Sequence, residues 1–252
     1  MLVKSEGIVL KEIRFKDTSK ILTIFSKDFG KIHAMAKGAY RPKSQLTGCT
    51  QVFGYSDFTF FKGRNFYHIN QGDIINSFYD LRENMERLMY GSYILELVEY
   101  SIVEEEPNEK LFLLLVKGLK VLSRLEKDFL KFVIAFELKY ISFLGYRPYL
   151  DKCVICGNNN YNRVKFSYHQ GGIICDKCFE TEPYCKNIDR NVIMHLKQLL
   201  YSPLDKLESI KIPKDVMSNL HEIMVKYILI NIEKDNFNSL NLIETITKNG
   251  GI

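Results

Sequence analysis

Two Cys-x-x-Cys pairs separated by eighteen residues constrain the fold of this 252-residue chain more than any other feature. The four cysteines are Cys153, Cys156, Cys175 and Cys178. Two residues between cysteines let the backbone turn so that both sulfurs face one point, and Gly157, directly after the first pair, suits such a turn. Residues 163–174 between the pairs are predicted to form a hairpin with Gly171 and Gly172 near its tip. The spacing therefore predicts a zinc ribbon over about residues 150–186.

The predicted metal site has a structural role. Four thiolates fill a tetrahedral shell around one Zn²⁺ ion and leave no position for water or substrate. Free buried cysteines and a redox dithiol are the alternatives, and two matched pairs disfavour both. His169 lies in the hairpin and is expected to be a surface histidine, while Cys49 and Cys185 are expected to be ordinary thiols.

The beginning of the chain carries no apolar targeting segment, and no run of about 18 apolar residues is present. We therefore expect a cytoplasmic protein without a membrane span. In a reducing compartment disulfides do not persist, which again favours metal binding for the cysteine pairs.

The first third of the chain has the pattern of strands. Segments rich in β-branched and aromatic residues alternate with short turns. These segments are 7–15, 20–26, 31–38, 52–61 and 66–75. Five short strands favour an oligonucleotide-binding (OB) type of β-barrel, although an SH3-like barrel has a similar count. We assign this barrel to residues 1–80.

From Asn84 onward apolar residues recur at helical spacing. Asn108 and Asp189 are predicted to cap helices, Gly145 to end one, and Pro213 to lie in the first turn of another. The chain is therefore predicted to have an α+β fold, in which an N-terminal five-stranded OB-type barrel precedes an α-helical domain, residues 81–252, with the zinc ribbon inserted in it.

The charge distribution indicates a polyanion partner. Residues 1–80 hold 12 Lys and Arg against 7 Asp and Glu, whereas the remainder is balanced at 23 of each, so the net charge of +5 lies in the predicted barrel. The candidate DNA-binding residues are Lys31, Lys37, Arg41, Lys43, Lys62 and Arg64. A solvated basic rim is the alternative.

Aromatic residues accompany these cations. Phe60, Phe61 and Phe66 flank the later basic turn, and Tyr40 and Tyr67 are further stacking candidates. Single-stranded nucleic acid needs cations for its phosphates and flat rings for its unstacked bases. Because these phenylalanines alternate with polar residues, we expect some of them to belong to the barrel core.

Enzyme motifs are missing from the sequence. It has no P-loop, no nucleophile elbow and no His-x-Glu with Pro-Cys-x-x-Cys, as a zinc deaminase would need. We therefore expect a protein that is not an enzyme. An RNA-binding zinc-ribbon protein, or an adaptor whose basic barrel binds an acidic protein surface, remains an alternative.

Two stretches go beyond these general features. Residues 7–44, GIVLKEIRFKDTSKILTIFSKDFGKIHAMAKGAYRPKS, resemble the start of the bacterial RecO family. Residues 136–157, FELKYISFLGYRPYLDKCVICG, and residues 166–178, FSYHQGGIICDKC, are similar to that family's junction between its helical core and its zinc element. The resemblance covers nearly the whole chain and weakens after about Asp189. Position 40 departs from the pattern, because many relatives have a basic residue where this chain has tyrosine.

The resemblance implies an OB barrel, a helical domain and an inserted zinc element. It implies a recombination mediator that binds single- and double-stranded DNA, anneals complementary strands and helps to load RecA onto coated single strands. Lys37, Arg41 and Lys43 match the family's basic loop. RecR and the acidic tail of the single-stranded DNA-binding protein are the implied protein partners, with RecA an indirect one. For the tail, our hypothesis is a groove in the helical domain that uses Arg124, Lys131 or Arg147.

Overall fold

The computed structural model describes residues 1–63, 66–241 and 243, which form two compact units. One unit comprises residues 1–125 and the described part of the C-terminal segment from Phe237, and the other comprises residues 126–236. None of the described helices is long and apolar enough to cross a bilayer. The predicted domain boundary near residue 80 stays a prediction, since these units describe compactness alone.

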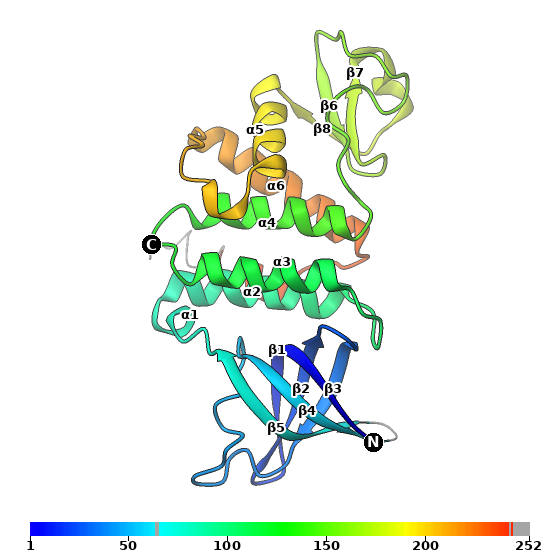
Figure 1. Ribbon diagram of the computed structural model, residues 1–252. Coiled ribbons are helices and arrows are strands. Elements are labelled where there is room, and N and C mark those ends of the chain that lie inside the picture. The colour runs from blue at the N-terminus through cyan, green and yellow to red at the C-terminus, as the bar shows by residue number, and fades with distance from the viewer. Residues whose placement is uncertain (64–65, 242, 244–252) are drawn as a thin grey trace. The chain divides into compact units, whose positions relative to one another are not determined.

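The first unit begins with a closed barrel of five strands (Figure 1). The strands are β1 (Leu2–Phe15), β2 (Ser19–Ser26), β3 (Gly30–Ala36), β4 (Tyr55–Lys62) and β5 (Tyr67–Asn76). Their order around the barrel is β1-β2-β3-β5-β4, and β4 pairs with β1 to close it. All neighbours are antiparallel except β3 and β5, which pair in parallel through Ala34 and Tyr67. The five-stranded barrel predicted from the sequence is confirmed.

Alternating burial along the strands builds the barrel core. In β3 every second residue, from Gly30 to Ala36, is buried, as expected for a strand with one face inward. A register shift between Val9 and Lys11 interrupts the β1–β2 ladder, as a β-bulge does when a long strand must bend around a barrel. The core consists of Val9, Leu22, Ile24, Ile32, Ala34, Ala36, Ala39, Cys49, Phe58, Phe60, Tyr67 and Ile69.

Three helices complete the N-terminal part of this unit: α1 (Asp80–Glu83), α2 (Met85–Ser101) and α3 (Glu109–Leu122). The side chain of Asn84 accepts a hydrogen bond from the Arg87 N–H at the start of α2. Asn108 caps α3 in the same way, through the Leu111 N–H, as predicted. The C-terminal segment belongs to this unit, because the Glu96 carboxylate accepts hydrogen bonds from the backbone N–H groups of Asn238 and Ser239.

The second unit combines helices with a small sheet. Its elements are α4 (Phe129–Phe143), β6 (Val164–Ser167), β7 (Gly172–Cys175), the 3-10 helix η1 (Asp176–Thr181), β8 (Cys185–Ile188), α5 (Arg190–Tyr201), the 3-10 helix η2 (Leu204–Lys206) and α6 (Lys214–Asn231). The sheet order is β7-β6-β8. Asp189 caps α5 through the Val192 N–H, as predicted. Pro213 stands at the N-cap of α6, one position before the first turn in which we expected it. The third strand, β8, was not predicted.

Candidate metal centre and nucleic-acid interface

The four predicted metal ligands converge on one point. Their Sγ atoms all lie within 4.8 Å of one another, with 3.6 Å between Cys156 and Cys175 and 3.9 Å between Cys175 and Cys178. A tetrahedron with Zn–S bonds of about 2.3 Å has edges of about 3.8 Å. The same separations far exceed the ~2.05 Å of a disulfide. The geometry therefore fits a single tetrahedral metal ion bound by four thiolates.

Backbone hydrogen bonds shape the first cysteine pair into a knuckle. The Gly157 N–H donates to the Cys153 carbonyl at 2.9 Å, and the Cys153 N–H donates to the Asn158 carbonyl at 2.8 Å. Gly157 has a φ of +72°, a conformation that glycine adopts without the steric cost of a Cβ. A tight turn at this position was the expectation, and it places both sulfurs of the pair on the same side.

Local electrostatics prepare this site for a cation. Burial opposes ionisation of Cys153, but the backbone N–H groups of Cys156, Cys175 and Ile155 outweigh it and lower the pKa of the thiol to about 6. Burial and the neighbouring sulfurs raise the pKa of Cys178 to about 12. The Cys178 thiol therefore resists ionisation on its own. A divalent cation among the four sulfurs reverses this, because it stabilises every thiolate that it touches.

We call residues 153–188 the four-cysteine element. Its β6–β7 hairpin turns through Gly171, with a φ of +64°, close to the predicted tip. Its own core is small: Cys153, Ile174, Cys175 and Cys178 are buried, with Val154, Tyr161, Phe179 and Cys185 packed against them. Three of the four buried residues of this cluster are candidate ligands, so a bound ion would supply much of the stability of this part of the element.

The other metal-site candidates do not join the cluster. The His169 ring stacks on Tyr184 with 4.7 Å between centroids, as suits an exposed histidine. The Cys185 thiol donates to the Glu182 carbonyl. Cys49 lies in the barrel core, and burial raises the pKa of its thiol to about 11. Neither cysteine is among the four clustered ligands.

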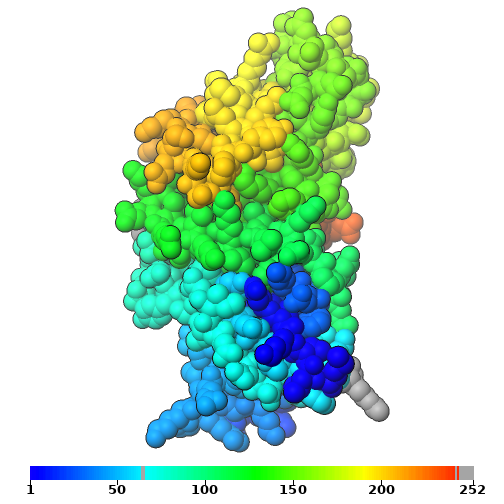
Figure 2. All heavy atoms as spheres, viewed as in Figure 1, coloured from blue at the N-terminus to red at the C-terminus, as the bar shows by residue number. Residues whose placement is uncertain are grey.

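A rigid loop presents three of the predicted DNA-binding cations. Lys37, Arg41 and Lys43 are all exposed in the segment between β3 and β4. The segment is anchored to the barrel, because Ala39 is fully buried in the barrel core and Leu46 packs against that core. In Figure 2 this medium-blue segment projects from the surface of the barrel. Ordered backbone with exposed cations is what a preformed phosphate-binding loop requires.

Tyr40 connects this basic loop to the turn between β1 and β2. Its backbone N–H donates to the Thr18 carbonyl at 3.0 Å, and its ring is 44% exposed. The Arg14 guanidinium lies 5.6 Å and the Lys20 ammonium 4.8 Å from the ring centroid. Arg14 was not among the predicted DNA-binding residues, although it is exposed and neighbours the loop. Only the pairing of two turns distant in sequence could have pointed to it.

Exposed Lys16 is a second missed cation, since it lies in the same β1–β2 turn. Two other predicted DNA-binding residues do not belong to the basic loop. The half-buried Lys31 donates to the Glu99 carbonyl at 2.9 Å, and the exposed Lys62 lies 5.3 Å from the Tyr67 ring centroid. Arg64 is outside the described residues.

The structure sorts the candidate stacking rings. Phe60 and Tyr67 belong to the barrel core, so Tyr67 is not a stacking surface. Phe61 and Phe66 are 50% and 38% exposed, as expected for the alternate residues of a barrel strand and its adjoining turn. Tyr40, Phe61 and Phe66 therefore remain as rings that a base can reach.

The three candidate partner-binding residues belong to both compact units. Lys131 lies in the first turn of α4, whereas Arg147 lies beyond the other end of that helix, 5.1 Å from the Tyr201 ring centroid. Arg124 is exposed and belongs to the first compact unit. Of the three, Lys131 lines a described cavity.

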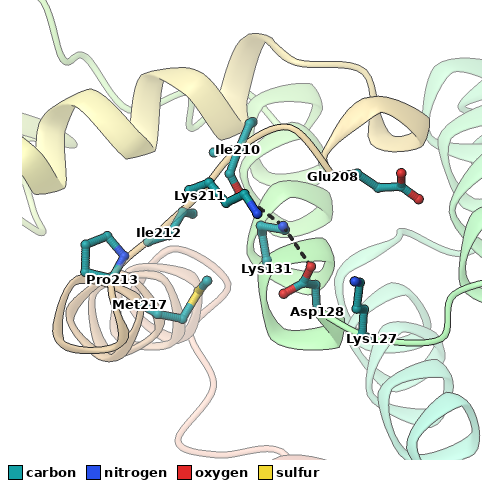
Figure 3. Close-up of a pocket in the computed structure, with 9 residues that line it drawn as sticks. All are labelled: Lys127, Asp128, Lys131, Glu208, Ile210, Lys211, Ile212, Pro213 and Met217. Carbon is teal, nitrogen blue, oxygen red and sulfur yellow. Dashed lines mark hydrogen bonds and ion pairs between the residues drawn. The ribbon is translucent and has the colours of Figure 1, made fainter.

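That cavity is an open pocket of about 820 Å³ (Figure 3). The Lys131 ammonium lies between the Asp128 carboxylate, at 3.0 Å, and the Ile210 carbonyl, at 3.1 Å. The pocket is lined by Lys127, Asp128, Lys131, Glu208, Ile210, Lys211, Ile212, Pro213 and Met217. Three lysines, two carboxylates and the apolar side chains of Ile210, Ile212, Pro213 and Met217 therefore meet at this pocket.

Together, the closed five-stranded barrel, the exposed cationic loop and the four-cysteine cluster define a class of barrel proteins with a candidate metal centre and exposed positive charge. The family models for Recombination protein O N terminal and Recombination protein O C terminal match residues 1–78 and 82–241. The chain is 35% identical to DNA repair protein RecO of Acetivibrio thermocellus, over 98% of both chains. It is 37% identical to DNA repair protein RecO of Alkaliphilus metalliredigens, over 98% of this chain and 100% of that protein. The chain belongs to the RecO family of DNA repair and recombination proteins.

Proposed function

We propose that this protein is a recombination mediator that is not an enzyme and that binds single- and double-stranded DNA through its barrel. The observation that carries the proposal is the anchored, exposed loop with Lys37, Arg41 and Lys43. Arg14, at the end of β1, extends this cationic surface beside Tyr40, and exposed Lys16 follows it in the β1–β2 turn. Lysine and arginine that neutralise phosphates release condensed counterions, so such a surface binds DNA strongly at low salt.

Annealing follows from how the surface holds a strand. Cations bind the backbone, and Tyr40 offers a face on which one unpaired base stacks for ~1–3 kcal/mol. The hydrogen-bonding edges of the bases then remain available to a complementary strand. No covalent step is needed, and neutralised phosphates lower the repulsion between the two strands. The predicted Lys31, Lys62 and Arg64 remain part of this proposal as outlying contacts.

The metal contributes to folding in this proposal. The four thiolates suit one Zn²⁺ ion, whose role is to hold the knuckles and the hairpin of the four-cysteine element together. Cys153, Cys156, Cys175 and Cys178 would all be its ligands, which leaves no coordination position for chemistry.

RecR, the acidic tail of the single-stranded DNA-binding protein and, indirectly, RecA are the proposed protein partners. We place the tail in the pocket beside Lys131. Lys127 and Lys211 are exposed at its edge and supply positive charge, while Ile212, Pro213 and Met217 supply apolar walls. Holding DNA and the coating protein on one chain raises their effective concentration for each other, which favours exchange and the loading of RecA.

The proposed DNA binding is tested by fluorescence anisotropy of a labelled single-stranded oligonucleotide, titrated with the full chain at several salt concentrations. We expect affinity to fall linearly on a log–log plot against salt. Annealing of two complementary labelled strands should then accelerate in the presence of the protein. Matched RNA oligonucleotides separate this function from the RNA-binding alternative. Absence of binding at low salt would refute the proposal and leave the adaptor alternative.

The peptide pocket gives a separate prediction. The double substitution Lys127→Glu and Lys211→Glu should weaken binding of a labelled acidic tail peptide by roughly tenfold, because attractive rim charges become repulsive. Isothermal titration calorimetry measures this. Lys206→Glu changes an exposed lysine of the same unit outside the pocket and is the matched control. Equal peptide affinity for the double variant and the control would move the tail site elsewhere.

A further inference from the structure

A second pocket lies on the four-cysteine element, and none of its lining residues is among those assigned to DNA above. It has a volume of about 570 Å³ and is open to solvent. Its chemically active lining residues are Tyr161, Arg163, Lys165, Phe179, Asp189 and Arg190. Three of these six side chains are cations and two are aromatic, so the pocket combines positive charge with flat apolar surface.

Two of the cations are held over one aromatic ring. The Arg163 guanidinium lies 5.7 Å and the Lys165 ammonium 4.4 Å from the centroid of Phe179. Arg163 directly precedes β6 and Lys165 is the second residue of that strand, and both cations contact the same ring. Phe179 directly follows the ligand Cys178 in η1, so the metal centre fixes the ring that orders both cations.

The third cation is ordered independently. The Arg190 guanidinium donates to the Tyr161 carbonyl at 3.0 Å, which joins the start of α5 to the segment before β6. The acidic residue of the pocket, Asp189, is already engaged, because its carboxylate accepts the Val192 N–H at 2.9 Å as the cap of α5. The three cations of this pocket therefore outnumber its one carboxylate, and that carboxylate is the N-cap of α5.

The half-buried ring of Tyr161 supplies the remaining feature. It packs against the metal cluster and also lines the pocket. Such a ring is rigid and offers a face at little entropic cost, which suits stacking of a nucleobase. The amides of Asn162 and Asn187 line the same pocket and can donate to bases or phosphates.

We propose that this pocket of the four-cysteine element is a second binding site for single-stranded nucleic acid, with Arg163, Lys165 and Arg190 on phosphates and Tyr161 stacked on a base. The inference rests on the proposed function in one respect, since it takes the ligand to be the same DNA that the barrel binds. An acidic peptide is the less fitting ligand. The pocket beside Lys131 has mainly aliphatic apolar walls, whereas this pocket adds two aromatic rings and two amides to Val164 and Ile188.

The first test removes two charges and keeps most of each side-chain stem. The substitutions Arg163→Gln and Lys165→Gln in the full chain should reduce the salt slope of single-strand binding by about 1.4, at roughly 0.7 per phosphate contact. Affinity at low salt should fall at least fivefold. Lys177→Gln, an exposed lysine of the same element outside the pocket, should leave both values unchanged. The metal content of each variant shows whether the element is still folded.

The second test detects a base at the pocket directly. The chain contains no tryptophan, so Tyr161→Trp introduces a single indole, which is excited selectively at wavelengths that tyrosine does not absorb. Oligothymidylate should quench this fluorescence with the same midpoint as the anisotropy titration, because a stacked base quenches indole emission. Tyr184→Trp is the control, since position 184 is exposed on the same element and lies outside the pocket. Its emission should not change.

The outcomes separate this inference from the proposed function. If the wild-type chain binds DNA but Tyr161→Trp is not quenched, or the double glutamine variant behaves like Lys177→Gln, the second site is wrong while the barrel site stands. If the acidic tail peptide, and not DNA, quenches Tyr161→Trp, the ligand class is wrong. If the wild-type chain binds no DNA at all, the proposed function fails first.

Discussion

Replacing Lys37, Arg41 and Lys43 together with alanine is expected to weaken single-stranded DNA binding about a hundredfold at 0.1 M salt. Each lost phosphate contact removes roughly 0.7 from the slope of log affinity against log salt, so three contacts remove about 2. The slope is the diagnostic quantity, because only lost ionic contacts change it. Anisotropy titrations between 0.05 and ~0.3 M salt measure both the affinity and the slope.

The matched control removes the same charge from other places in the same compact unit. Lys4, Lys110 and Lys120 are exposed and lie outside the basic loop. Their triple alanine variant should retain most of the affinity and nearly the full slope. The loop variant should keep its fold, since buried Ala39 and Leu46 anchor the segment and remain unchanged. Equal behaviour of the two triple variants would remove the loop from the DNA-binding surface.

The second large effect concerns the metal centre. Cys175→Ser is expected to abolish stoichiometric metal binding and to unfold the four-cysteine element locally. Cys175 is fully buried among the other ligands. Structural zinc sites contribute apparent binding free energies of about 10–16 kcal/mol in small peptides, which is far more than this small core can supply. A strong chelator should have the same effect on the wild-type chain.

Metal content per chain and hydrogen exchange followed by mass spectrometry measure this effect. Exchange should accelerate over residues 153–188, while α4, most of whose residues are buried, should remain protected. Cys185→Ser is the control, because Cys185 packs beside the cluster without belonging to it. A Cys175→Ser protein with a full complement of metal and unchanged exchange would show that these four sulfurs are not the ligands.

Local chemistry explains what could be predicted from the sequence. An N-cap depends on the side chain of one residue and the backbone N–H groups two or three positions later. The starts of the helices after Asn108 and Asp189 could therefore be predicted. Each cysteine pair, with Gly157 after the first, forms its turn from residues close in sequence. One short hairpin then brings the two pairs together. The metal site could therefore be predicted as a whole, whereas β8 and the one-position displacement of Pro213 could not.

Contacts between distant segments explain what could not be predicted. The parallel pairing of β3 with β5 closes the barrel and decides that Tyr67 points into the core while Phe61 remains exposed. The placement of Arg14 beside Tyr40 depends on two turns meeting, and both residues look like ordinary strand and loop positions in the sequence.

The sequence by itself determined the five strands, the helices, the metal ligands and the concentration of positive charge in the first third of the chain, because each depends on residues close in sequence or on composition. Only the tertiary structure decided which cations share a surface. It separates Lys131 from Arg147 by the length of α4, commits Lys31 to the Glu99 carbonyl and gathers Arg163, Lys165 and Arg190 around one pocket. The physical reason is that the sequence gives the position of each charged residue along the chain, whereas packing decides on which surface its side chain lies.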